Sequence, residues 1–225
     1  LKFWKRNCNS TFCFHHVSTD EVFGSLKIRD KPFEENSNYK PNSPYSASKA
    51  SSDHLVRTWN KTYNLPISIT HCGNNFGPYQ SPEKLIPLTI IKCLQKQKIP
   101  VYGNGENIRD WIFVKDHVNA LLKIMEKNII NKNFVIGSRN EKTNIEVIND
   151  ICEIINNNQQ LNYDCKSLIH FVDDRLGHDF RYALNPSSFE KNTGWIPKHS
   201  FSQSIIETIY WYLNNKDWWK NFIKF

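Results

Sequence analysis

Two short segments carry side chains whose types and spacing suit proton transfer. Tyr45 and Lys49 are four residues apart, and Asp20 and Glu21 are adjacent. Because residues i and i+4 share one face of a helix, the Lys49 ammonium could stabilise a Tyr45 phenolate, lowering the pKa of a phenol that normally titrates at about 10. A lowered pKa would make Tyr45 a base near neutral pH. The competing interpretation of this spacing is an exposed helical pair met by chance.

The carboxylates of Asp20 and Glu21 follow a short apolar segment that is typical of a β-strand. Adjacent acidic residues are usually a solvated loop edge. These two come just after the carboxyl end of a predicted parallel strand, where open α/β sheets place their ligands. Adjacent residues that leave a strand point in different directions, so one could act as an acid and the other as a base. Elimination of water needs that division of roles.

Short apolar strands alternate with amphipathic helices, which predicts an α/β architecture with parallel pairing. Asp116 is expected to cap the helix that it begins, and the tryptophans near the C-terminus are expected to serve packing. Polar loops at 24–44 and 73–82 are long enough to be functional. Strands are predicted at 11–17, 66–71, 100–105 (an edge and turn), 109–114, 134–136 and 168–172, and helices at 44–63, 83–98, 116–127, 143–156 and 201–213.

Length and composition exclude several classes of protein. The 225 residues carry 29 Lys and Arg against 22 Asp and Glu, which is a folding composition that predicts one large domain, or one plus a small lobe. The basic residues are spread and mixed with acids, so no nucleic-acid binding is expected, although the net charge of +7 suits a small phosphate-bearing ligand. No apolar run approaches the roughly 20 residues that cross a bilayer, so no membrane association is expected.

The six cysteines contain no C-x-x-C pair, so we expect reduced thiols in a cytoplasmic protein and no metal. The chain starts with Leu1 and its only methionine is Met125, so we expect a fragment or a misassigned start. None of its eight glycines forms a G-x-G-x-x-G turn, which is the turn that binds dinucleotide pyrophosphates.

Several ordered motifs resemble those of the dTDP-glucose 4,6-dehydratases, which are NAD-dependent enzymes of nucleotide-sugar metabolism within the extended short-chain dehydrogenase/reductases. The resemblance implies a partial Rossmann-like parallel sheet with a smaller C-terminal α/β lobe. Residues 1–80 would form the C-terminal part of the NAD-binding domain, and 81–225 mostly the nucleotide-sugar-binding lobe, with segments returning to the first domain. The motifs are HVSTDEVFG at 16–24, PNSPYSASKASSDH at 41–54, NNFGPY at 74–79, PEKLIP at 82–87, YGNG at 102–105, RDW at 109–111 and DRLGHD at 174–179.

The resemblance also implies a role for each proton-transfer side chain. Tyr45 would deprotonate the sugar C4 hydroxyl while hydride passes from C4 to NAD, and Thr19 would hydrogen-bond the C4 oxygen. Lys49 would tune Tyr45 and hold the nicotinamide ribose, so these two residues are also the expected cofactor contacts. Glu21 would remove the C5 proton and Asp20 would protonate the departing C6 hydroxyl, after which the hydride would return to C6.

The nucleotide-sugar substrate is expected to lie among further residues that match the family. There, cations and amides would meet the diphosphate, and an aromatic ring would meet the base. Guanidinium groups suit this task because they form charge-assisted pairs with phosphate oxygens, although an ion pair with a neighbouring aspartate is the alternative for each arginine. The expected substrate contacts are Asn74, Lys84, Leu85, Tyr102, Arg109, Arg175 and His178.

Some positions depart from the family's usual pattern. Val135 stands where Asn is common, and because valine lacks an amide, weaker ligand binding is expected. Phe76 in place of Tyr and Gly73 in place of Ser are expected to be mild changes. The family's glycine-rich NAD-binding half does not precede these motifs. The strand at 11–17 would then expose an apolar edge, so poor solubility and no NAD binding are expected of this chain alone.

Three functions fit these observations. The first is a 4,6-dehydratase that forms a homodimer when full length. The second is another nucleotide-sugar enzyme of the extended family, such as an epimerase or decarboxylase, which would keep Tyr45 and Lys49 but would not need both Asp20 and Glu21. The third is a non-catalytic remnant that at best binds nucleotide sugar. The sequence leaves open whether the nucleotide is thymidine or uridine diphosphate.

Overall fold

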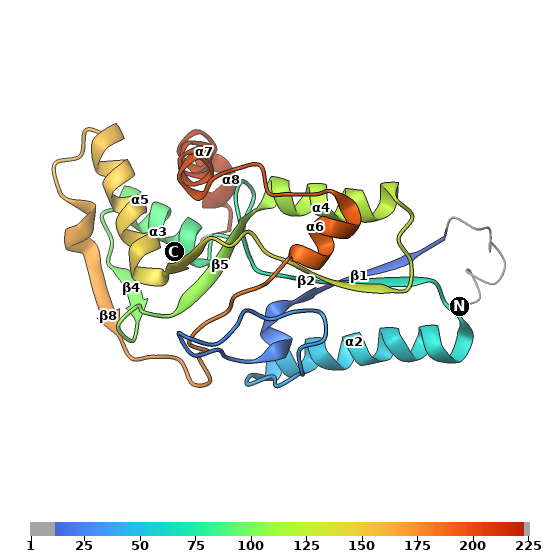
Figure 1. Ribbon diagram of the computed structural model, residues 1–225. Helices are drawn as coiled ribbons and strands as arrows, with labels where there is room; N and C mark the ends of the chain where they lie inside the picture. The colour runs from blue at the N-terminus through green and yellow to red at the C-terminus, as the bar shows by residue number, and fades with distance from the viewer. Residues whose placement is uncertain (1–11, 223–225) are drawn as a thin grey trace.

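The computed structural model describes residues 12–222, and its first layer is a parallel three-stranded sheet. The sheet has the order β1 (Phe14–Thr19), β2 (Ile67–Cys72) and β6 (Lys132–Ile136). The helix α2 (Pro44–Tyr63) lies along one face, and α4 (Val114–Glu126) and α6 (Ser187–Thr193) lie on the other (Figure 1). The predicted α/β fold with parallel pairing is therefore confirmed.

A second group of elements packs beside this sheet, at the left of Figure 1. One small sheet joins β3 (Asn74–Phe76), β5 (Ile108–Phe113) and β7 (Glu141–Thr143), and another pairs β4 (Ile99–Tyr102) with β8 (Ile169–Val172). The largest hydrophobic cluster fills the space between them and their helices, and it includes Ile86, Ile151 and Ile205. The helices are α3 (Leu85–Leu94), α5 (Asn144–Asn158), α7 (Phe201–Asn214) and α8 (Lys216–Lys220), with a short 3₁₀ turn at η2 (Cys165–Leu168). Another 3₁₀ turn, η1 (Asp20–Phe23), directly follows β1 in the first layer.

Local sequence signals fix the ends of α2, the helix that carries Tyr45 and Lys49. Ser43 and Ser46 form a capping box, with the Ser43 hydroxyl accepting from Ser46 N at 3.1 Å, and Pro44 occupies the first turn. At the other end, Asn64 adopts a left-handed conformation with φ of 56°, which ends the helix. The predicted helix over 44–63 is confirmed in full.

Elsewhere, long-range contacts changed what the sequence predicted. Asp116 does not cap α4, which begins at Val114; the Asp116 carboxylate is buried and accepts hydrogen bonds from Lys198 N at 3.1 Å, His199 N at 3.0 Å and His199 Nδ1 at 2.8 Å. The loop predicted at 73–82 contains β3, which is too short to show a periodicity. The short elements β7, α6 and α8 escaped prediction for the same reason.

The tryptophan-rich end serves packing, as predicted. Trp219 is 3% exposed and its Nε1 donates to Tyr212 O at 2.9 Å, while Trp211 and Trp218 pack against the ring of Tyr79. No helix within residues 12–222 is long and apolar enough to span a bilayer.

Candidate active site

The end of β1 presents Thr19, Asp20 and Glu21 as a compact acidic turn. Thr19 is the N-cap of η1, and its Oγ1 accepts from Glu21 N at 3.3 Å. The same hydroxyl lies 3.3 Å from Asp20 Oδ1 and 3.4 Å from Glu21 Oε1. Because one hydroxyl has one hydrogen, Thr19 can donate to only one of these carboxyl groups at a time. The turn thus leaves carboxyl oxygens for other partners.

Asp20 has the environment of a proton donor. Its side chain is 2% exposed, and within residues 12–222 its Oδ2 atom has no hydrogen-bond partner. Burial, followed by the charges of Glu21 and Asp110, raises the pKa of Asp20 well above its usual value. Because burial disfavours the charged form, this carboxyl keeps its proton to higher pH than an exposed aspartate does.

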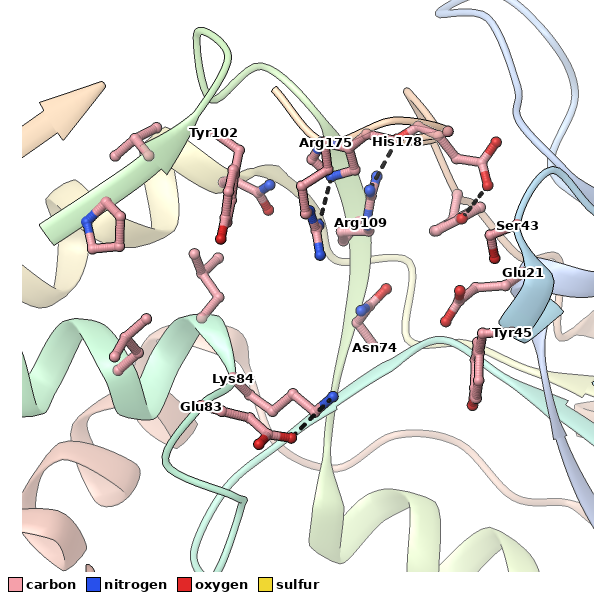
Figure 2. Close-up of a pocket in the computed structure, with 18 of the residues that line it drawn as sticks. Glu21, Ser43, Tyr45, Asn74, Glu83, Lys84, Tyr102, Arg109, Arg175 and His178 are labelled. Atoms are coloured by element: carbon pink, nitrogen blue, oxygen red, sulfur yellow. Dashed lines mark hydrogen bonds and ion pairs between the residues drawn. The ribbon is translucent and has the colours of Figure 1, made fainter. Parts of the chain in front are cut away.

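Glu21 differs from Asp20 because it faces a cavity. Burial raises the pKa of Glu21, and the positive charge of Arg109 partly opposes that shift. The carboxylate lines the cavity beside Tyr45, whereas Asp20 is not among the lining residues (Figure 2). Two adjacent carboxyl groups therefore occupy different environments, which is how one fold separates an acid from a base.

Tyr45 and Lys49 lie on α2 as the i, i+4 spacing predicts, but their interaction differs from the prediction. Partial burial, followed by the negative charge of Glu21, raises the pKa of Tyr45 instead of lowering it. The Lys49 ammonium donates to Val17 O at 3.0 Å, and no hydrogen bond joins it to Tyr45 in the described part of the chain. Burial first, and the nearby negative charge second, thus set the direction of the shift, so the predicted lowering of the Tyr45 pKa is wrong for this arrangement.

The cavity beside Glu21 and Tyr45 has a volume of about 650 Å³. It brings together residues from η1, α2, β3, α3, β4, β5, α5 and the 175–182 segment (Figure 2). Thr19, Asp20 and Lys49 do not line it. The predicted site residues that do line it are Glu21, Tyr45, Asn74, Lys84, Leu85, Tyr102, Arg109, Arg175 and His178.

Arg109 is a buried cation in the wall of this cavity. Its guanidinium donates to Ile108 O at 2.8 Å, Phe180 O at 3.2 Å and Asp179 O at 2.9 Å, and it stacks on the Tyr182 ring at 4.5 Å from the centroid. Burial lowers the Arg109 pKa, but a guanidinium stays charged in proteins. The sequence also allowed an ion pair between Arg109 and its neighbour Asp110. The guanidinium binds these backbone carbonyl groups instead.

Asp110 instead holds the loop after β6. It is fully buried, and its carboxylate accepts from Ser138 N, Ser138 Oγ and Asn140 N at 3.0 to 3.2 Å. A side chain at Gly137 would bring a Cβ to 2.3 Å from Asp110 Oδ2, and one at Gly73 would lie 2.7 Å from Asp110 O. Both glycines therefore allow close approach to Asp110.

Arg175 is a second cation in the cavity wall, and it contacts His178 and Tyr102 there. The Arg175 guanidinium lies over the Tyr102 ring at 4.9 Å from the centroid, and its Nη2 donates to His178 Nε2 at 2.9 Å. Because arginine has no acceptor, His178 Nε2 must accept and its Nδ1 must donate to Asp174 Oδ1 at 2.6 Å. Burial lowers the pKa of His178, which agrees with this neutral tautomer. The exposed Arg175 thus stacks on Tyr102 in the cavity wall. The alternative ion pair with Asp174 does not form, because the Asp174 carboxylate binds His178.

Other residues are placed where the sequence did not predict. Val135 is fully buried in a cluster with Val22, Phe23 and Leu184, outside the cavity lining, so the expected loss of a ligand contact there is wrong. Gln80, Trp111, Asp179 and Tyr182 were missed as lining residues. The only signal for the last two was their position in or just after the DRLGHD motif.

The parallel sheet, α2 and the cation-lined cavity define a Rossmann-like α/β protein. Residues 1–208 match the family model described as GDP-mannose 4,6 dehydratase, and the chain belongs to that family. A dTDP-glucose 4,6-dehydratase of Escherichia coli is 46% identical, over 97% of this chain and 65% of the relative. One from Neisseria meningitidis serogroup B is 47% identical, over 95% of this chain and 61% of the relative. The chain thus spans less than two thirds of these relatives' length.

Solved structures agree with this assignment. The dTDP-glucose 4,6-dehydratase of Bacillus anthracis, crystallised with NAD, has a TM-score of 0.89 and 41% identity, over 99% of this chain and 68% of its own. The enzyme of Streptomyces venezuelae, with NAD and TYD bound, has a TM-score of 0.88 and 38% identity, over 94% and 63%. A UDP-glucuronic acid 4-epimerase of Bacillus cereus, 22% identical with a TM-score of 0.81 over 90% and 62%, shares the fold.

Proposed function

We propose that this chain is the catalytic and substrate-binding part of an NAD-dependent dTDP-glucose 4,6-dehydratase, a lyase that forms the 4-keto-6-deoxy sugar. The observation that carries the proposal is the cavity itself. It has Glu21 and Tyr45 at one end and Tyr102 at the other, with the cations Arg109 and Arg175 between them (Figure 2), and so suits a sugar joined to a nucleoside diphosphate. The relatives at 46% and 47% identity support the same reaction.

In the proposed reaction, Tyr45 Oη takes the proton of the sugar C4 hydroxyl, and Thr19 Oγ1 hydrogen-bonds the C4 oxygen. When bound, NAD would supply the acceptor for the C4 hydride and the donor for its return to C6, and it would also add a positive charge to the site. Such a charge would counter the effect of Glu21 on the pKa of Tyr45. Lys49 lies one turn further along α2 and supplies a second positive charge.

Water elimination is assigned to the two carboxyl groups of the acidic turn. Once C4 is a ketone, Glu21 takes the proton from C5, and the C6 hydroxyl leaves with a proton from Asp20 as water. Asp20 suits the acid role because burial raises its pKa and so favours the protonated form, and Glu21 suits the base role because it lines the cavity. An epimerase would not need this second carboxyl group, which is why we favour the dehydratase.

The described residues fit one part of NAD, the ribose next to the nicotinamide. Tyr45 is 55% exposed, so its hydroxyl can be reached from outside the protein. The Lys49 ammonium has three hydrogens, of which the Val17 carbonyl accepts one at 3.0 Å. A phenol and an ammonium are suitable partners for the two hydroxyl groups of a ribose. We therefore assign Tyr45 and Lys49 as cofactor contacts.

The nucleotide end is assigned to the cationic and aromatic wall. Arg109, Arg175 and Lys84 supply positive charge for the diphosphate, and the aliphatic side chain of Leu85 with the Tyr102 ring supplies an apolar surface for the base. Asn74 Oδ1 is buried and has no hydrogen-bond partner among the described residues. The side-chain amide can therefore rotate toward a ligand without losing a hydrogen bond at this oxygen. His178 holds Arg175 at 2.9 Å.

The test is turnover of dTDP-glucose by the complete gene product that contains residues 1–225, in deuterium oxide and with NAD. We expect 4-keto-6-deoxy product with one solvent deuterium at C5, because Glu21 exchanges its proton with solvent. Tyr45→Phe should abolish the product and leave binding of thymidine diphosphate intact. An epimerised sugar, or UDP-glucose consumed in preference to dTDP-glucose, would contradict the proposal.

Assembly, location and domain boundaries are further parts of this proposal. We propose a cytoplasmic homodimer built through α2, supported by the outward-facing Leu55 and Trp59, which are 62% and 39% exposed. The cysteines at 13, 72, 93, 152 and 165 carry free thiols, whereas Cys8 lies outside the described residues. We also propose a boundary near residue 80, with β6 returning to the first domain. Light scattering that gives a monomeric mass would overturn the dimer.

A further inference from the structure

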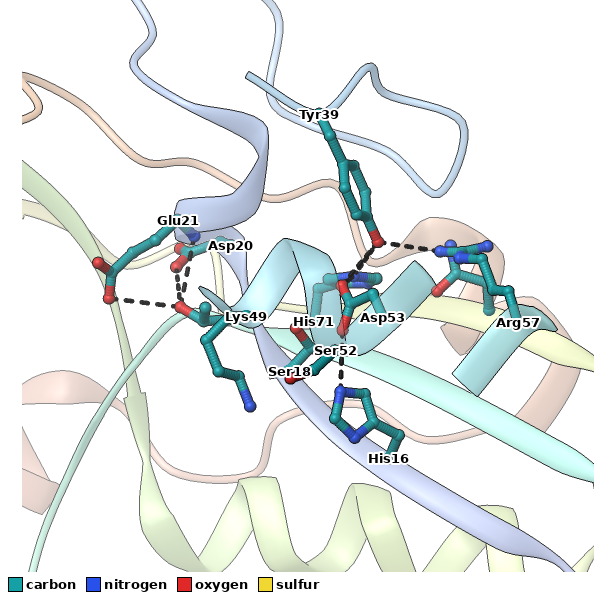
Figure 3. Close-up of polar contacts among 12 residues, drawn as sticks. His16, Ser18, Asp20, Glu21, Tyr39, Lys49, Ser52, Asp53, Arg57 and His71 are labelled. Atoms are coloured by element: carbon teal, nitrogen blue, oxygen red, sulfur yellow. Dashed lines mark hydrogen bonds and ion pairs between the residues drawn. The ribbon is translucent and has the colours of Figure 1, made fainter. Parts of the chain in front are cut away.

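A buried polar network lies beneath α2 and centres on the Asp53 carboxylate. Asp53 is fully buried, and its Oδ1 accepts from His16 Nε2 at 2.9 Å. Its Oδ2 accepts from His71 Nε2 at 2.8 Å and from the Tyr39 hydroxyl at 2.7 Å. Arg57 in turn donates to the Tyr39 oxygen at 3.0 Å, as Figure 3 shows. The carboxylate therefore binds three side chains directly and a fourth, Arg57, through Tyr39.

These partners come from the elements that carry the proposed catalytic groups. His16 is on β1, three residues before Thr19, and His71 is on the neighbouring strand β2. Tyr39 precedes the capping box of α2 by four residues. Asp53 itself is four residues beyond Lys49 and eight beyond Tyr45, so all three lie on one side of the helix. The network thus connects β1 to the helix that faces it.

Apolar contacts do little to fix the position of α2 on the sheet, and outside the network Lys49 Nζ donates to Val17 O of β1 at 3.0 Å. The buried residues of this 20-residue helix are Ser46, Ala50 and Asp53. Serine and alanine have small side chains and bury little apolar surface, so hydrophobic packing specifies the rotation of α2 only weakly. The hydrogen bonds of a charged carboxylate are directional and among the stronger ones in proteins. Asp53 is therefore the residue of α2 best able to set its register.

We propose that Asp53 is a positioning residue of the active site, which sets where Tyr45 and Lys49 lie relative to Thr19 and Glu21. The inference depends on the proposed function only for the change in kcat that it predicts. Hydrogen bonds from His71 and Tyr39 outweigh the opposing effect of burial and hold the Asp53 pKa at about 2, so the carboxylate is charged at neutral pH. A charged carboxylate accepts hydrogen bonds only, so both imidazoles donate to it.

Asp53→Asn is an informative substitution because it replaces a hydrogen-bond acceptor of the network with a donor. Each oxygen of Asp53 accepts from an imidazole N–H, so an asparagine must turn its NH₂ group toward one of them. The variant keeps the shape of the side chain, but it either places two donors face to face or forces one imidazole to move its proton to Nδ1, which in His71 is buried without a partner among the described residues. Tyr39→Phe is a milder change, because it removes one donor to Asp53 and leaves both histidines. Ser51→Ala, on the exposed side of α2, is the matched control.

The experiment compares these variants in the complete gene product, with kinetics on dTDP-glucose and thermal unfolding of the same samples. We expect kcat of Asp53→Asn to fall by about 10- to 100-fold, because a displacement of about 1 Å has effects of this size. KM should stay within about twofold, because Arg109 and Arg175 lie on other elements. Tyr39→Phe should lie between Asp53→Asn and the wild type, and Ser51→Ala should match the wild type.

If Asp53 only stabilised the fold, Asp53→Asn would reduce activity only in proportion to the fraction of the protein that remains folded. A folded Asp53→Asn protein with kcat within about twofold of the wild type would overturn the proposal, as would a rise in KM alone. If the wild type shows no turnover, the proposed function fails, and NMR of ¹³C-labelled tyrosine decides the inference separately. A shifted Tyr45 ring signal with an unchanged Tyr102 signal in Asp53→Asn supports positioning, and two unchanged signals overturn it.

Discussion

Replacing Asp20 with asparagine separates its proposed chemistry from its structural role. The side chain makes one long hydrogen bond, in which Thr19 Oγ1 donates to Asp20 Oδ1 at 3.3 Å, and an asparagine oxygen can keep that bond. Its Oδ2 atom has no partner within residues 12–222, so the new NH₂ group replaces no hydrogen bond. We therefore expect Asp20→Asn to change the free energy of unfolding at pH 6 by less than about 1 kcal/mol.

The effect on the reaction should be far larger. A positioned general acid contributes about 10²- to 10⁴-fold to a rate, which corresponds to about 2.7 to 5.5 kcal/mol of barrier. Loss of water from C6 needs the proton of Asp20, whereas removal of the C5 proton needs Glu21. In deuterium oxide, Asp20→Asn should therefore place deuterium at C5 of recovered substrate without releasing water. Glu21→Gln should neither incorporate deuterium at C5 nor release water.

The pH dependence of stability gives an independent check on Asp20. Burial raises its pKa in the folded protein above the unfolded value. The protonated group thus contributes stability that is fully present below the unfolded pKa and lost as pH rises through the folded pKa. Asparagine does not titrate, so the stability of Asp20→Asn relative to the wild type should increase with pH through this window.

Mass spectrometry of the sugar product and denaturant unfolding at several pH values measure both effects. A turnover rate of Asp20→Asn within about threefold of the wild type would show that another group supplies the proton. A stability difference that does not change with pH would show that Asp20 is not held protonated by burial. Either result would refute the acid role that we infer for Asp20 from its burial and its raised pKa.

Three further predictions follow from the cavity wall and the core. Val135→Asn should lower the free energy of unfolding by about 2–4 kcal/mol in denaturant titrations, because it buries an amide among apolar side chains, while KM stays unchanged. Tyr102→Leu should weaken binding of thymidine diphosphate by about 2- to 30-fold in calorimetry, because Arg175 loses its aromatic partner. The same affinity should fall as pH drops below the ordinary His178 value of 6.5, because protonated Nε2 can no longer accept from Arg175; an unchanged affinity in acid would contradict this. Because burial depresses the folded pKa of His178, its contribution to stability is also lost as pH falls.

The sequence by itself determined the parts of the protein that depend on neighbouring residues. The capping box at Ser43, Pro44 in the first turn and Asn64 at the end specified α2, and the i, i+4 spacing placed Tyr45 and Lys49 on one side of it. The strand followed by two carboxylates placed Asp20 and Glu21 at the end of β1. These features needed no knowledge of distant contacts, because caps, periodicity and strand ends act over a few residues.

Only the tertiary structure decided the environments of these groups. Asp20 and Glu21 are neighbours in sequence, yet one is buried and the other lines the cavity. The direction of the Tyr45 pKa shift depends on burial first and then on the charge of Glu21, which is distant in sequence. Whether Val135 faces a ligand or the core, and whether Asp116 caps a helix or binds His199, depended on packing between elements far apart in the chain. Burial and charge act through space, so sequence spacing alone cannot fix them.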